Sequence, residues 1–309
     1  MVDTFDKRSG RIGIDISTSM LRAVSLDASG VVSASLSKSV DTRELAVEQL
    51  VTFIKEVKAE WGEFMRLGVS VPGLVDRRSQ RVAFSIHIPE HSAIDIVSEI
   101  RSATGAEAFI ENDANAAAYG EFMLGAGRGS RDLFYVTLGD GIGGAFIFNG
   151  EIWHGKTGFA GELGYVAINS EGTRLEDVAS TQNIIRRTRS RFHQDSTSSL
   201  NKLAEESITL ADIIAAAKSD DDFSQMMLQR TGGYIGSAVA NVINLLNIER
   251  IVIGGEIVRA KHLVLHAVIQ RAHELSFRPA FDSTTIVEGE LGPDAAAVGA
   301  ALLGAQPVQ

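Results

Sequence analysis

Short runs of alternating apolar and polar residues open the chain and predict β-strands. The three runs are RIGIDIS, LRAVSLDASG and VVSASLSKSV, with a polar turn at Asp27–Gly30. The apolar spacing then becomes that of an amphipathic helix, whose shared face is Leu45, Leu50, Ile54, Val57 and Trp61. Two further strands, RLGVSVPGLVD and EAFIEND, flank a helix expected over residues 92–102. This order predicts an α/β layer in which helices cover a mixed sheet.

The second half of the chain repeats the plan. DLFYVTLGDG, GGAFIFNG and EIWHG read as strands, and Asn149-Gly150 is a strong hairpin signal. A long helical region begins at Leu175, and YIGSAVANVINLLNI leads into the strand RIVIGG. Two similar halves indicate an internal duplication, with a boundary near residues 118–129. We therefore expect one domain over residues 1–120, joined by a C-terminal helix within 293–309, and a second over 121–292.

Composition narrows the class of protein. The 309 residues are 45% hydrophobic and 22% charged, the proportions of a soluble globular protein. A formal net charge of -10 argues against nucleic acid as a partner. The absence of cysteine excludes disulfides, thiolate zinc sites and a cysteine nucleophile. The charged start MVDTFDKRSG has no signal-peptide core, and no apolar run is long enough to cross a membrane, so we expect a cytoplasmic protein.

An apolar run stops abruptly in the stretch FIENDANAAAYGE, where an alanine-rich helix is expected to begin. Asn112 or Asp113 could cap that helix, because a short polar side chain accepts a hydrogen bond from a first-turn N–H. A carboxylate fixed at the end of a core strand is also suited to act as a general base. Both interpretations of Asp113 stay open on these residues alone.

Three glycine- or hydroxyl-rich turns follow predicted strands. The run Gly139-Asp140-Gly141-Ile142-Gly143-Gly144 matches the letters of a dinucleotide fingerprint, but a strand follows it where that fingerprint requires a helix. Its backbone N–H groups could meet a phosphate, and a sharp hairpin equally favours glycine. The turn Asp15-Ile16-Ser17-Thr18-Ser19 offers hydroxyls and a carboxylate suited to water-bound magnesium. The third turn is Gly254-Gly255-Glu256, after a buried strand.

Several motifs together resemble the ROK family of repressors and sugar kinases, which has the actin-like ATPase fold. The motifs are ENDANAAAYGE, LGDGIGGAFIFNGEIWHGKTGFAGELGY, LEDVAS and VIGGEIV, in the family's order over residues 12–303. The resemblance implies two actin-like domains with mixed five-stranded sheets, a ligand cleft between them, and a homodimer. It also implies ATP and Mg²⁺, and transfer of the γ-phosphoryl group to a hydroxyl of a hexose, amino sugar or cyclitol.

The resemblance also implies roles for particular residues. Asp113 matches the catalytic base, and the sugar-binding positions match Gly73, His87, Asn112, Asp113, Glu162, Tyr165 and Glu176. The ATP-binding positions match Asp15, Ser17, Thr18, Ser19, Gly139, Asp140, Gly141, Gly143, Gly254, Gly255 and Glu256, with Asp15 holding Mg²⁺ through water.

The chain departs from the family pattern at several positions. Ser17 and Thr18 replace the glycines of the family's first phosphate loop, which puts close backbone approach to phosphate in doubt. Tyr165 replaces the family's histidine, and its cysteine cluster is absent, so no structural zinc is expected. His87 stands where an asparagine contacts sugar, and with Tyr165 it suggests a substrate other than plain glucose.

Other features have less specific interpretations. His262 and His266 are spaced to bind metal, but a packed or solvated helix face is favoured. The run of arginines over residues 186–191 is expected to be an exposed helix face. His154 and Lys156 either line a cleft or form a hairpin rim.

Two functional classes remain open. The first is an ATP-dependent sugar kinase, and the second is a sugar-sensing regulator or pseudokinase with a degenerate first phosphate loop. Only about ten residues precede the first strand, too few for the helix-turn-helix that family repressors carry there.

Overall fold

The computed structural model describes residues 10–86, 88–260 and 262–306. Contacts divide the chain into two compact units. Unit 1 comprises Met1–Arg128, Ile152–Ala160 and Leu291–Gln309, and unit 2 comprises Gly129–Glu151 and Gly161–Glu290. The chain therefore returns to unit 1 twice, once for a short segment and once for its last helix.

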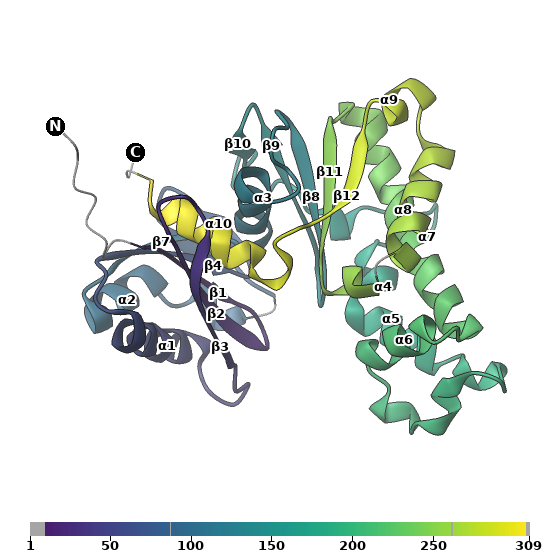
Figure 1. Ribbon diagram of the computed structural model, residues 1–309, viewed down its shortest axis with the longest axis horizontal. Helices are drawn as coiled ribbons and strands as arrows, with labels where there is room; N and C mark the ends of the chain where they lie inside the picture. The colour runs from purple at the N-terminus through teal and green to yellow at the C-terminus, as the bar shows by residue number, and fades with distance from the viewer. Residues whose placement is uncertain (1–9, 87, 261, 307–309) are drawn as a thin grey trace. The chain divides into compact units, whose positions relative to one another are not determined.

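Unit 1 is built on a five-stranded mixed sheet in the order β3-β2-β1-β4-β7 (Figure 1). Its strands are β1 (Arg11–Ile16), β2 (Met20–Leu26), β3 (Val32–Ser39), β4 (Arg66–Val71) and β7 (Glu107–Asn112), and a separate hairpin is formed by β5 (Leu74–Asp76) and β6 (Arg81–Phe84). The first three strands are antiparallel, whereas β1, β4 and β7 run parallel. The carboxyl ends of these parallel strands therefore meet at one edge of the sheet.

Helices cover both faces of the unit 1 sheet. The helices are α1 (Ala46–Trp61), α2 (Ile96–Thr104), α3 (Asp113–Leu124) and α10 (Ala295–Gly304), with short 3-10 turns η1 (Pro89–Ser92) and η7 (Gly292–Asp294). Apolar residues of α1 and α2 pack with Ile12, Ile14 and Ile16 of β1 in one core cluster. α10 lies against the opposite face beside α3 (Figure 1). α10 approaches β4 closely because Gly68 of β4 has no side chain. A Cβ built on Gly68 would lie 1.8 Å from the Ala300 carbonyl oxygen.

Unit 2 has a second five-stranded mixed sheet, in the order β10-β9-β8-β11-β12. Its strands are β8 (Leu133–Leu138), β9 (Ile142–Phe148), β10 (Glu151–Trp153), β11 (Arg250–Gly255) and β12 (Thr285–Glu288). β8 and β9 are antiparallel, and β8, β11 and β12 are parallel. The predicted α/β class with two mixed five-stranded sheets is confirmed.

Helices pack on the unit 2 sheet through one large apolar cluster that includes Phe134, Phe192 and Ile253. The helices are α4 (Glu176–Ala179), α5 (Thr181–Arg189), α6 (Leu210–Lys218), α7 (Asp222–Leu246), α8 (His262–Leu275) and α9 (Arg278–Asp282). The 3-10 turns are η2 (Leu163–Tyr165), η3 (Phe192–Gln194), η4 (Ser199–Lys202), η5 (Glu205–Ser207) and η6 (Glu256–Ala260).

Two sequence-based expectations need correction. The helix expected over 92–102 begins only at Ile96, because Pro89–Ser92 forms a 3-10 turn and the Asp95 side chain caps α2 by accepting the Ser98 N–H. The arginine run is not a uniformly exposed face. Arg187 donates to the Thr231 hydroxyl at 2.7 Å and its guanidinium lies over the Tyr234 ring, and desolvation lowers its pKa. Over the described residues, no helix is long and apolar enough to cross a membrane.

Candidate functional site

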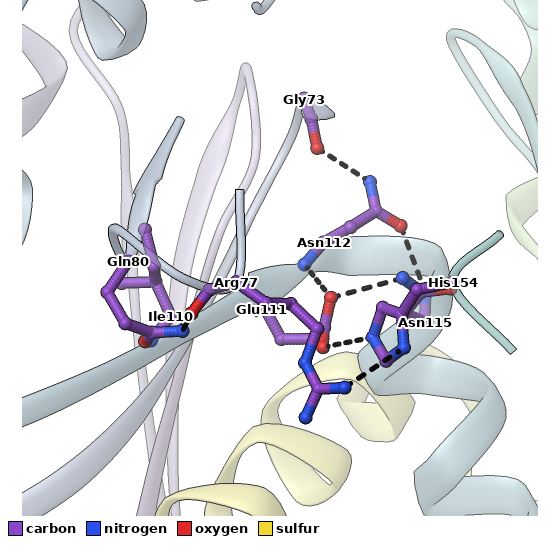
Figure 2. Close-up of polar contacts among 8 residues, drawn as sticks. All are labelled: Gly73, Arg77, Gln80, Ile110, Glu111, Asn112, Asn115 and His154. Carbon is purple, nitrogen blue, oxygen red and sulfur yellow. Dashed lines mark hydrogen bonds and ion pairs between the residues drawn. The ribbon is translucent and has the colours of Figure 1, made fainter. Parts of the chain in front are cut away.

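The carboxyl ends of β1, β4 and β7 bring several predicted site residues together in unit 1. Asp15 lies opposite Ser70 in the β1–β4 pairing, and Val71 lies opposite Asn112 in the β4–β7 pairing. The Asn112 side-chain amide donates to the Gly73 carbonyl oxygen at 2.9 Å (Figure 2). Ligand sites of α/β folds form at this edge of the sheet, so the geometry fits a binding site.

The structure separates the two roles that the sequence left open for Asn112 and Asp113. Asn112 is the cap of α3, since its Oδ1 accepts the Asn115 N–H at 3.0 Å. Asp113 is the first helical residue, and its Oδ1 accepts from Asn112 Nδ2 and from the Ala114 N–H, both at 2.9 Å. A helix N-terminus stabilises a negative charge. The Asp113 carboxylate is therefore oriented at the strand end without serving as the cap.

Glu111 is a buried carboxylate that the sequence analysis did not single out. Its side chain is 2% exposed, and its Oε1 accepts from the Asn112 N–H at 2.9 Å and from Asn115 Nδ2 at 3.1 Å. Its Oε2 lies 2.9 Å from Nε2 of His154 (Figure 2). Glu111 thus contacts both sides of the strand-to-helix junction and a residue 43 positions further along the chain.

His154 also faces Arg77, whose Nη1 lies 3.5 Å from the histidine Nδ1. A guanidinium only donates, so Nδ1 is the acceptor, and Nε2 then carries the proton that is donated to Glu111. The sequence left open whether His154 lines a cleft or forms a hairpin rim. In the structure its side chain is 12% exposed, and its ring contacts Arg77 and Glu111 of unit 1. Lys156 lies on the same segment and is exposed.

Asp15 is buried at the carboxyl end of β1, opposite Ser70 of β4. Its carboxylate accepts a short hydrogen bond from the Ser70 hydroxyl. Burial raises the pKa of Asp15 to about 7, and the negative charge of Asp113 adds to that rise while Ser70 opposes it. A cation placed at this edge would reverse the effect by stabilising the ionised carboxylate.

The β1–β2 turn is organised by its own hydroxyl group. Ser17 Oγ accepts the Met20 N–H at 3.0 Å and donates to the Met20 carbonyl oxygen at 3.1 Å. Thr18 is half-buried and Ser19 is exposed. The Ser17 hydroxyl therefore has a structural role in this turn, and phosphate contact would have to come from the neighbouring groups.

In unit 2 the first half of the glycine run, residues 139–141, forms the β8–β9 turn, and its second half begins the strand β9. Residues of α4 and α5 bind both ends of this turn. The Thr181 N–H donates to the Gly139 carbonyl oxygen at 2.8 Å, and the Ile142 N–H donates to Glu176 Oε2 at 2.8 Å. A Cβ on Gly139 would meet no atom within 4 Å, so the turn's backbone is open to a ligand. Asp140 is exposed on the same turn, and Gly141 and Gly143 lie on either side of Ile142.

The third predicted turn lies beside this one. In the parallel β11–β8 pairing, Gly254 is opposite Thr137 and Gly255 is opposite Leu138, the residue before Gly139. Gly255 has a φ of 90°, and a Cβ there would lie 2.4 Å from Leu138 backbone atoms. Close strand pairing thus requires this glycine, whatever ligand it meets. Glu256 is exposed and forms an ion pair with Arg259.

Glu162, Tyr165 and Glu176 lie around a short hairpin in unit 2. Glu162 is exposed at the start of η2, and Tyr165 ends it. The bridge between Ala167 and Arg174 closes the hairpin, and the Arg174 guanidinium lies 4.9 Å from the Tyr165 ring centroid. The segment 165–174 is therefore organised by backbone pairing and a cation–π contact. His87, the remaining predicted sugar contact, lies outside the described residues.

Among the described residues, no group of three or more His, Cys, Asp and Glu side chains is arranged to hold a metal ion. The His262–His266 pair, with ring centroids 6.0 Å apart, therefore lacks a third ligand of those types in the described part of the chain. The oxygen donors of Asp15, Ser70 and Asp113 suit Mg²⁺, which takes few protein ligands and completes its shell with water and phosphate.

Comparison with known proteins places this arrangement in a family. The ROK family model matches residues 11–306. A glucokinase of Thermotoga maritima is 33% identical over 270 residues, covering 84% of this chain and 84% of the relative. The xylose repressor of Bacillus subtilis is 25% identical over 310 residues, covering 96% of this chain and 77% of the repressor.

A similar solved structure is that of a ROK family glucokinase from Streptomyces griseus, in complex with glucose and AMPPNP. It aligns with a TM-score of 0.86 and 25% identity, covering 97% of this chain and 100% of that one. The family model covers nearly the whole chain and the fold agrees, so the chain belongs to the ROK family.

Proposed function

We propose that the protein is an ATP-dependent kinase that phosphorylates a hydroxyl of a hexose or a related amino sugar or cyclitol. Asp113 acts as the general base. The sugar is contacted by Asn112, Gly73, Glu162, Glu176, Tyr165 and His87. ATP is contacted by the turns at 15–19, 139–143 and 254–256. The glucokinase of Thermotoga maritima and the ROK glucokinase complexed with glucose and AMPPNP support this choice of reaction and donor.

The placement of Asp113 is the observation that carries the proposal. Its carboxylate lies at the carboxyl end of a core strand, while the adjacent Asn112 caps the helix. A base must lie within hydrogen-bond reach of the hydroxyl that it deprotonates, so a fixed carboxylate is the required group. Phosphoryl transfer otherwise needs positioning and charge neutralisation.

The other residues supply positioning. Glu176 joins the glycine turn to the sugar-binding segment, because its Oε2 accepts the Ile142 N–H. Carboxylates and amides suit sugar hydroxyls, which both donate and accept. Mg²⁺, held through water by Asp15, would neutralise charge on the phosphates when bound.

Replacing Asp113 by Asn tests the base role. Asp113→Asn keeps the size of the side chain and the Oδ1 acceptor but removes the basic carboxylate. We expect sugar binding to persist and turnover to fall by about 10²- to 10⁴-fold, measured as ADP release with Mg²⁺-ATP. Asp95→Asn is the matched control, because asparagine also caps a helix well and α2 should be unaffected. Unchanged turnover in Asp113→Asn would refute the assignment.

The substrate is to be identified by the same ADP-release measurement across hexoses, aminohexoses and cyclitols. His87 and Tyr165 replace the residues that usually contact glucose in the family, so we expect a compound other than glucose to give the highest kcat/KM. Glucose as the best substrate would contradict that part of the proposal.

The second candidate is a sugar-sensing regulator without phosphoryl transfer. It is favoured by the similarity to the xylose repressor and by the Ser17 hydroxyl, which is bound within the first phosphate turn. If no compound is turned over while a sugar raises the melting temperature, this function replaces the kinase, since a ligand that binds only the folded state stabilises it.

A further inference from the structure

We propose that Glu111 and His154 form a positioning pair that fixes the strand-to-helix junction carrying Asp113. The inference rests on the proposed role of Asp113 and assigns two residues outside the predicted site. Neither residue is proposed to touch the reacting atoms.

The burial of Glu111 makes its partners necessary. Its side chain is 2% exposed, and an ionised carboxylate at such a place is stable only when it is well hydrogen-bonded. Oε1 receives two donors from the junction, the Asn112 N–H and Asn115 Nδ2. These bonds hold the Asn112 backbone before Asp113 and the Asn115 side chain after it, and the remaining oxygen accepts a hydrogen bond from His154.

His154 brings a separate segment to the junction. The segment Ile152–Ala160 belongs to unit 1 although unit 2 flanks it in sequence. It closes on itself through the Ala160 N–H, which donates to the His154 carbonyl oxygen at 3.3 Å. Gly158 packs on β5 so closely that a Cβ there would lie 2.6 Å from the Val75 carbonyl oxygen. The packing of Gly158 thus holds the segment that carries His154, and Arg77 and Glu111 hold the His154 ring.

The consequence is a rigid support for the base. If His154 cannot donate, Glu111 Oε2 is buried without its hydrogen-bond donor. The Glu111 side chain then shifts toward another donor, which loosens Asn112 and Asn115. A displacement of about 1 Å at a reacting group costs up to about 100-fold in rate. The effect should appear in kcat, because the side-chain hydrogen-bond partners of Glu111 and His154 among the described residues include no residue proposed to bind ATP.

Two amide substitutions separate this role from simple loss of a histidine. In His154→Gln the side-chain nitrogen reaches the place of Nε2 and still donates to Glu111. In His154→Asn the amide reaches only the place of Nδ1 and cannot. We expect kcat to stay within about 3-fold for the glutamine variant and to fall about 10- to 100-fold for the asparagine variant, with the KM for ATP changed less than about 3-fold in both.

Amide hydrogen exchange over residues 110–117 gives a readout that does not depend on activity. We expect faster exchange in His154→Asn and in Glu111→Gln than in the wild type, and wild-type exchange in His154→Gln. Equal kcat and equal exchange in the glutamine and asparagine variants would overturn the positioning pair. If the wild type turns over no sugar, the kinase proposal fails, and the exchange comparison still decides whether the pair fixes the junction.

Discussion

Three consecutive residues at one strand end have different surroundings because the backbone changes from strand to helix between them. Side chains alternate along β7, so Glu111 and Asn112 point to opposite faces of the sheet. Glu111 is buried, whereas Asn112 is half-buried and reaches Gly73. The helix starts at the next residue, and Asp113 joins its first turn. The three residues thus have distinct roles, although they form one polar cluster in the sequence. Glu111 is a buried acid, Asn112 is the helix cap, and Asp113 is an acid in the first turn of the helix.

His91 leads to a prediction about pH. Its side chain is fully buried in η1, and neither ring nitrogen has a hydrogen-bond partner among the described atoms. Burial lowers its pKa from 6.5 to about 4, against the opposing charge of Glu90. The unfolded chain therefore binds more protons between these two values, so the contribution of His91 to stability is present above pH 6.5 and is lost as pH falls toward 4.

A leucine substitution isolates this contribution. Between pH 7 and pH 5 the unfolding free energy of the wild type should fall by about 2 kcal/mol more than that of His91→Leu, measured by urea titration. His193→Gln, at an exposed histidine, should keep the wild-type dependence. Parallel pH profiles for the wild type and His91→Leu would show that His91 is protonated in the folded state as easily as in the unfolded chain.

At the scale of elements, α10 and α3 pack closely because glycine removes a side chain between them. A Cβ on Gly299 would lie 1.6 Å from the Ala116 carbonyl oxygen. Since this contact is with backbone, Gly299→Ala should force the helices apart and destabilise the protein on the order of 3 kcal/mol, seen as a lower melting temperature.

Gly233 is the matched control for this substitution. It lies within α7, and a Cβ there would meet no atom within 4 Å. Gly233→Ala should leave the melting temperature unchanged or raise it. Alanine favours helix over glycine, by up to about 1 kcal/mol in the free energy of unfolding. Equal effects of the two substitutions would mean that helix propensity, and not packing, determines the response.

The same scale shows what the sequence could predict. The strands around Asp113 and the β8–β9 turn were predictable, because period-2 patterns and turn residues are local signals. The start of α2 was misplaced by a few residues, since Pro89 and Asp95 offer competing starts. The Glu111–His154 contact was missed because it joins positions far apart in the chain. No local pattern marks the segment 152–160 as part of unit 1.

At the scale of the whole molecule, separate cores suggest that the two units unfold in separable steps. One apolar cluster lies within unit 1 and another within unit 2. Without ligand we expect the calorimetric enthalpy of unfolding to exceed the van't Hoff enthalpy, which is the sign of more than one transition. Glu162 lies in unit 2 and is a proposed sugar contact, so a sugar with a nonhydrolysable ATP analogue should raise the midpoint of the transition of that unit.

Glu162→Ala separates the effect of the ligand from the intrinsic stability of unit 2. Glu162 is exposed, so its truncation should leave the ligand-free transitions in place. Its loss should remove the effect of sugar on the transition of unit 2, because that unit then lacks its proposed contact with the ligand. If sugar raises the transition of unit 2 in Glu162→Ala as much as in the wild type, the proposed sugar contact at Glu162 is wrong.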